Sequence, residues 1–129
     1  METASDTGFD ILLIDDEPEL LLVVGEVLRA HGYSVLVAKD AGYALQQLGQ
    51  NKVRLIVLDI NLGGENGLEL LTFLKRNNPG VHIVLYTGMP SEPSDVNDML
   101  KLGADCFVSK TQGTQALAYS IQQLIGKPK

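Results

Sequence analysis

Five short apolar runs, each followed by a stretch of helical periodicity, constrain the fold of this chain more than any other feature. The runs are continuous rather than alternating, which is typical of strands buried on both faces of a sheet. The stretches that follow them carry apolar residues three and four positions apart, the pattern of amphipathic helices. We expect the strands at residues 11–14, 35–37, 55–58, 83–86 and 106–108. Five β-α units joined by short loops predict an α/β fold, a doubly wound parallel sheet with helices on both faces.

Local signals predict where several helices begin and end. Pro18 suits the first turn of a helix, and Gly32 is expected to end that helix. Asp40 is the expected N-cap of the second helix and Gly49 its expected end. Gly103 is expected to end the shorter fourth helix. The single domain should span residues 10–126, with tails at 1–9 and 127–129.

Composition excludes several classes of protein. Ten basic residues against sixteen acidic ones give a net charge of −6, which disfavours direct nucleic-acid binding because phosphates would be repelled. The longest apolar run, residues 20–24, is far too short to span a membrane, and the acidic N-terminus does not resemble a secretory signal. The one cysteine, Cys106, allows no internal disulfide, which suits a cytoplasmic location.

Polar side chains follow four of the five predicted strands. Asp15 and Asp16 follow the first strand, Asp59 the third and Thr87 the fourth, and Lys110 comes two residues after the fifth. In a doubly wound sheet, ligands bind beyond the carboxyl ends of the strands. Three carboxylates at that edge favour a hard divalent cation, and Mg²⁺ suits a site that combines few carboxylates with phosphate oxygens. Asp59 could then attack phosphorus, as aspartates do when they form aspartyl phosphates.

Four motifs give the chain a family resemblance. They are "LLIDDE", "LIVLDINLGGENGLELL", "IVLYTG" and "GADCFVSK". From about residue 11 to residue 125, the chain resembles the receiver domain of two-component response regulators. The resemblance implies a flavodoxin-like fold with strand order 2-1-3-4-5. It also implies a signalling domain in the cytoplasm that catalyses only its own phosphorylation and dephosphorylation.

The resemblance also implies roles for the residues at the strand ends. Asp59 would be the phosphoacceptor, and Lys110 would pair with a phosphoryl oxygen. Asp16 and Asp59 would bind Mg²⁺ directly, Asp15 would do so through water, and Asn61 would supply its backbone carbonyl. The phosphoryl donor would be a sensor histidine kinase or a histidine phosphotransfer protein.

A switch and an output surface follow from the same resemblance. Thr87 and Phe107 would form the switch pair, a hydroxyl drawn towards the phosphoryl group and an aromatic ring that turns inward. The segment 88–95, with two prolines, would be a moving loop. A downstream effector would bind the face formed by the fourth helix, fifth strand and fifth helix. A phosphorylation-dependent homodimer stays open. Gly67, eight residues after Asp59, matches a glycine of the family pattern.

The chain departs from the family pattern at two places, and a third position is one where the family varies. Gly63, followed by Gly64, stands where the family often has proline, which predicts a flexible loop. Thr111 follows Lys110 where the family usually has proline after a cis bond, so a trans bond is expected here. Met89 occupies a variable position that tunes hydrolysis of the phosphoryl group, and the lifetime stays open.

Other functions fit these residues less well. Singly, Asp15 and Asp16 could be helix-capping acids, and Lys110 a solvated surface lysine. A phosphatase of the haloacid-dehalogenase type needs a second aspartate at the position of Asn61, whose amide cannot transfer a proton. A nucleotide-binding or redox module lacks its glycine-rich phosphate loop after the first strand. A degenerate receiver that only binds proteins stays open because of Thr111.

Overall fold

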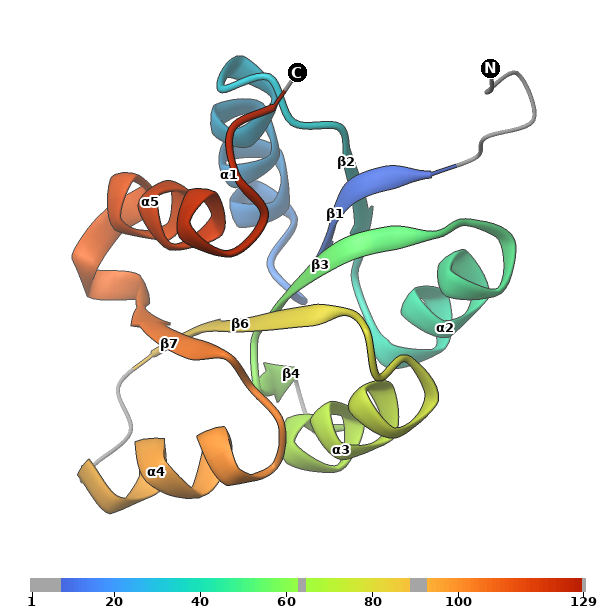
Figure 1. Cartoon of the computed structure of the whole chain (residues 1–129), viewed down its shortest axis with the longest axis vertical. Helices are drawn as coiled ribbons and strands as arrows, with labels where there is room; N and C mark the ends of the chain where they lie inside the picture. The colour runs from blue at the N-terminus through green and yellow to red at the C-terminus, as the bar shows by residue number, and fades with distance from the viewer. Residues whose placement is uncertain (1–7, 63–64, 89–92, 129) are drawn as a thin grey trace.

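A parallel sheet of five strands lies between two layers of helices (Figure 1). The structure is a computed structural model that describes residues 8–62, 65–88 and 93–128. The strands of the sheet are β1 (Phe9–Ile14), β2 (Val35–Ala38), β3 (Val53–Leu58), β6 (His82–Thr87) and β7 (Cys106–Ser109). The helices are α1 (Pro18–Ala30), α2 (Ala41–Gln50), α3 (Gly67–Asn77), α4 (Pro93–Lys101) and α5 (Gly113–Ile125).

The order of the strands confirms the predicted doubly wound topology. The sheet runs β2-β1-β3-β6-β7, and all neighbouring strands are parallel. When only these five strands are counted, this is the expected order 2-1-3-4-5. The structure adds one feature that the sequence did not indicate, an antiparallel pair formed by β4 (Asn61–Leu62) and β5 (Glu65–Asn66) directly after β3.

The continuous apolar runs form strands because helices bury both faces of the sheet. On one face, Val24 and Leu28 of α1 and Leu117 of α5 pack against alternate residues of the strands. On the other face, α2, α3 and α4 cover the remaining strand residues, with Leu71 and Leu74 fully buried. Both faces of the central strands therefore exclude water, and only the sheet edges and the strand ends can offer polar groups to a ligand.

Most of the predicted helix boundaries are confirmed. Gly32 and Gly103 follow α1 and α4 with φ of 102° and 120°, a conformation that glycine adopts at little cost. Asp40 caps α2 by accepting a hydrogen bond from the backbone N–H of Tyr43 at 2.8 Å. The prediction that Gly49 ends α2 was wrong, because the helix continues to Gln50. One glycine in a last turn costs only about 1 kcal/mol, which the rest of the helix tolerates.

The segment predicted as a moving loop, residues 88–95, includes the start of α4. Its residues 89–92 lie outside the described residues, but α4 already begins at Pro93, so the expectation was wrong for residues 93–95. Proline fits the first turn of a helix because its missing N–H would have no partner there. Gly63, Gly64 and Met89 also lie outside the described residues. Among the helices described, none is both long and apolar enough to cross a membrane.

Candidate functional site

The carboxyl ends of four neighbouring strands bring the candidate site residues together. Ile14 of β1 is paired with Leu58 of β3, so Asp15 and Asp59 extend two adjacent strands from the same level. The sheet hydrogen bonding continues one residue beyond both strands, since the N–H groups of Asp15 and Asp59 donate to carbonyls of neighbouring strands at 3.1 Å. The register of the sheet therefore determines that these two aspartates meet.

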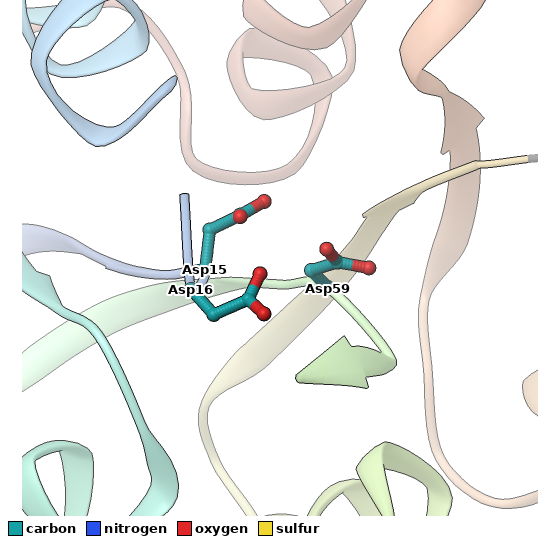
Figure 2. Close-up of side chains that lie close together, drawn as sticks. All are labelled: Asp15, Asp16 and Asp59. Atoms are coloured by element: carbon teal, nitrogen blue, oxygen red, sulfur yellow. The ribbon is translucent and has the colours of Figure 1, made fainter. Parts of the chain in front are cut away.

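Three carboxylate side chains lie close together at this edge, as Figure 2 shows. Asp15, Asp16 and Asp59 each offer an oxygen that lies within 4.8 Å of the oxygens of the other two. The Asp15 and Asp59 side chains are 1 % and 3 % exposed, whereas Asp16 is open to solvent. A cluster with two buried members and one accessible member could hold a metal ion, because one oxygen of each carboxylate lies near the others and Asp16 leaves the cluster open to solvent.

Lys110 places its ammonium group among the carboxylates. Its Nζ lies 2.8 Å from Asp15 Oδ2, 2.9 Å from Asp59 Oδ2 and 3.1 Å from Glu17 Oε1. Glu17 was not predicted as a member of the site, although it belongs to the "DDE" run, because its contact depends on the reach of two long side chains. The lysine reduces the repulsion between the like charges that the sequence places side by side.

Burial and charge shift the pKa values in the site. Burial raises the pKa of Asp15 to about 6, although hydrogen bonds from Lys110 and from the N–H of Glu17 act in the opposite direction. The charge of Asp59 adds a smaller rise to the pKa of Asp15. Burial would lower the pKa of Lys110, but its hydrogen bonds with three carboxylates outweigh burial and raise it. The lysine therefore remains a cation, while the Asp15 charge is costly to maintain.

Two donors orient the carboxylate of Asp59 through the oxygen that Lys110 does not contact. The hydroxyl of Thr87, at the end of β6, donates to Asp59 Oδ1 at 2.6 Å. The backbone N–H of Asn61 donates to the same oxygen at 3.0 Å. Asp59 Oδ2 accepts the hydrogen bond of the lysine. Both oxygens of this buried carboxylate are thus held in place, so its orientation is determined before any ligand arrives.

Gly67 fixes the loop that follows Asp59. It is buried at the first position of α3, and a β-carbon at this position would overlap the backbone of Ile60. Only glycine allows the helix to approach the residue next to Asp59 so closely. The family glycine that the sequence indicated therefore has a physical reason in the packing of this loop.

The second member of the predicted switch pair lies in the sheet. Phe107 of β7 is paired with Leu85 of β6, and its half-buried ring packs against the core between the sheet and helices α2, α3 and α4. Thr87 is paired with Ser109, two residues farther along the same strands. The two predicted switch residues thus stand on adjacent strands, with Thr87 closer to the carboxylates.

The turn after β7 contains Lys110 and Thr111. The described residues include no cis peptide bond, in agreement with the expected trans bond. Instead, residues Lys110–Gln112 form the short helix η1, which is capped by Ser109.

Comparison with known proteins assigns the family. Residues 11–122 match the model of the response regulator receiver domain. The nitrogen assimilation regulatory protein NtrX of Azorhizobium caulinodans is 40 % identical over 103 residues, which cover 78 % of this chain and 22 % of that protein. The transcriptional regulatory protein GlrR of Escherichia coli is 30 % identical over 115 residues, covering 89 % of this chain and 26 % of GlrR. The chain thus spans about a quarter of these curated relatives.

Solved structures show the same fold. The receiver domain of NtrX from Brucella abortus superposes with a TM-score of 0.83 at 29 % identity, covering 90 % of this chain and 98 % of that structure. A CheY-like receiver domain from Methanospirillum hungatei gives a TM-score of 0.81 at 28 % identity, with 92 % and 93 % covered. The sheet order, the match over 112 of the 129 residues and these superpositions agree. The chain belongs to the family of response regulator receiver domains, the signal-receiving modules of two-component systems.

Proposed function

We propose that this domain, residues 10–126, accepts a phosphoryl group on Asp59 from a histidine kinase or a histidine phosphotransfer protein. The observation that carries the proposal is the environment of Asp59. Its buried carboxylate is held by Thr87 and Asn61 on one oxygen and by Lys110 on the other, beside two further carboxylates. A carboxylate restrained in this way is suited to nucleophilic attack, because little reorganisation precedes the reaction.

Asp59, Lys110 and Thr87 would each have a separate role in the phosphoryl transfer. An oxygen of Asp59 attacks phosphorus, a new O–P bond forms, and the P–N bond of a phosphohistidine donor breaks, leaving histidine. The ammonium of Lys110, already 2.9 Å from Asp59 Oδ2, would pair with a phosphoryl oxygen and stabilise the negative charge that passes to Asp59. The hydroxyl of Thr87 would donate to another phosphoryl oxygen, since it already donates to Asp59.

The acid cluster fits a divalent cation, and we propose Mg²⁺. Asp16 and Asp59 would bind it directly, Asp15 through water, and Asn61 through its backbone carbonyl. Oxygen ligands and open access through Asp16 suit a hard cation that keeps part of its water shell. When bound, the cation would supply positive charge that offsets the repulsion between the carboxylates and an incoming phosphoryl group.

Phosphorylation would change the surface of the domain through Thr87 and Phe107. A phosphoryl group adds negative charge and acceptor oxygens at Asp59, so the Thr87 hydroxyl would follow it, and the Phe107 ring would move into the space left behind. The affected surface would be formed by α4, β7 and α5, where an effector protein or domain, or a second copy of the chain, would bind. The net charge of −6 argues against DNA as the direct ligand of this segment.

Intact-protein mass spectrometry after incubation with acetyl phosphate and Mg²⁺ tests the proposal. We expect one added phosphoryl group on the wild type and none on Asp59→Asn or on a sample treated with EDTA. Asp98→Asn, which removes an exposed carboxylate of α4, is the matched control and should be phosphorylated normally. An adduct that persists in Asp59→Asn would refute the assignment. If the wild type gains no phosphoryl group and binds no beryllofluoride, phosphoryl acceptance itself is refuted.

A further inference from the structure

The turn between β7 and α5 contains a closed set of polar contacts. Ser109 Oγ accepts a hydrogen bond from the N–H of Thr111 at 3.2 Å and lies 2.8 Å from the Thr111 hydroxyl. In return, Gln112 Oε1 accepts a hydrogen bond from the N–H of Ser109 at 2.8 Å. The Ser109 side chain also accepts from the N–H of Gln112, which completes a reciprocal capping box.

The two residues of this capping box, Ser109 and Gln112, stand on either side of Lys110 in the sequence. Ser109 is buried at 5 % exposure and paired with Thr87, so the start of the turn is fixed to the sheet beside the acid cluster. Lys110 is the first residue of η1, directly after Ser109, and Gly113 then turns the chain into α5 with φ of 87°. Because both ends of the turn are fixed, the direction in which the chain leaves β7 is also fixed. With the chain leaving β7 in this direction, the Lys110 side chain reaches the carboxylates of Asp15 and Asp59.

We propose that Ser109 and Gln112 are positioning residues for phosphoryl acceptance, because the capping box they form aims Lys110 at Asp59. The proposal rests on the proposed function. The ammonium group of Lys110 lies within 3 Å of Asp59. The backbone of Lys110, however, belongs to the short helix η1, and short helices of this type have little stability of their own. The box supplies the backbone hydrogen bonds that the turn would otherwise lack.

Gln112 is the residue to change, since it is exposed and its loss leaves the buried core intact. Gln112→Ala removes the acceptor for the Ser109 N–H, and we expect phosphorylation by acetyl phosphate to slow by about threefold to tenfold. Gln115→Ala is the matched control, because Gln115 is exposed on α5, three residues farther along, and makes the same change in composition. Gln112→Glu restores the acceptor in a standard capping box and should return the rate to within about twofold of the wild type.

A second measurement follows the lysine directly. In the metal-free protein, the ¹⁵N signal of the Lys110 ammonium group should be sharp because three carboxylates accept its protons. We expect this signal to broaden in Gln112→Ala, to remain sharp in Gln115→Ala and to recover in Gln112→Glu. A change in stability alone would not produce this pattern, since the three variants are compared in the folded state.

The outcomes separate the two proposals. If Gln112→Ala matches Gln115→Ala in both the rate and the lysine signal, the positioning role is refuted. If the wild type is not phosphorylated at all, the proposed function fails, but the lysine signal still decides whether the box positions Lys110. A slower Gln112→Ala that Gln112→Glu does not rescue would also contradict the capping-box explanation.

Discussion

Ionisation of Asp15 should destabilise the metal-free protein, and the loss in the free energy of unfolding can be measured. The side chain is 1 % exposed, and burial raises its pKa from 3.8 to about 6 despite the hydrogen bonds from Lys110 and Glu17. A pKa that rises this far on folding corresponds to about 3 kcal/mol of unfolding free energy, lost when the group ionises. The direction of the pH dependence follows from the linkage between proton binding and folding. Because the pKa in the folded state is the higher one, the stability is fully present below pH 3.8 and is lost as the pH rises through about 6.

Replacing Asp15 by asparagine removes this pH dependence. Asparagine has nearly the same shape, cannot ionise and still offers an acceptor to the N–H of Glu17, which now donates to Asp15 Oδ1 at 2.9 Å. We therefore expect Asp15→Asn to be about 2–3 kcal/mol more stable than the wild type at pH 8, with the difference closing towards pH 4. This range already includes the loss of the interaction with Lys110, because that interaction lowers the pKa of Asp15 from which the range is worked.

Urea unfolding in EDTA, followed by circular dichroism between pH 4 and pH 8, measures this difference. Asp98→Asn is the matched control, because it makes the same chemical change at an exposed position of α4 and should leave the pH profile of the wild type unchanged. A difference between Asp15→Asn and the wild type that stays constant across the pH range would refute the reasoning. A wild type that is the more stable protein at pH 8 in EDTA would refute it as well.

Three further predictions follow from single contacts. Gly67→Ala forces a β-carbon into the backbone of the loop after β3 and should cost about 2–4 kcal/mol in urea unfolding, whereas Gly49→Ala, which meets no atom within 4 Å, should add about 0.5–1 kcal/mol. Thr87→Ala leaves the buried carboxylate of Asp59 without one donor and should cost about 1–3 kcal/mol, with Thr87→Ser recovering most of the loss. Thr111→Pro removes an N–H that the capping box uses and disfavours a helical residue before it, so phosphorylation should slow about threefold or more; an unchanged rate would contradict this.

The fold was predictable because burial on both faces leaves a clear sequence signal. Continuous apolar runs are typical of central parallel strands, and each predicted run lies inside an observed strand. Errors occurred where the local signal was weak compared with the surrounding helix. Gly49 was expected to end α2, yet a glycine that keeps a helical backbone near the end of a helix costs too little to stop it. The β4–β5 pair is two residues long on each side and has no periodicity to detect.

The core of the site was predictable because topology alone brings it together. Asp15 and Asp59 directly follow strands and Thr87 is the last residue of one, so the order and register of the strands suffice to make them neighbours. Glu17 was missed because its contact with Lys110 depends on side-chain conformations at the surface rather than on the sheet. The capping box after β7 was missed for a related reason. The sequence Ser-Lys-Thr-Gln fits many turns, and only the structure shows that Gln112 reaches the N–H of Ser109.

The balance of charge at the site is the physical reason to expect a requirement for a divalent cation. Asp15, Asp16, Glu17 and Asp59 bring four carboxylates to this edge, and Lys110 is the cation that contacts three of them among the described residues. An anionic phosphoryl donor must approach this excess of negative charge, and at short range the repulsion is large because Asp15 and Asp59 are buried. The ammonium group cannot neutralise the cluster and the incoming phosphoryl group together. Phosphoryl acceptance on Asp59 should therefore depend steeply on the concentration of the divalent cation, whereas the domain should still fold when the cation is absent.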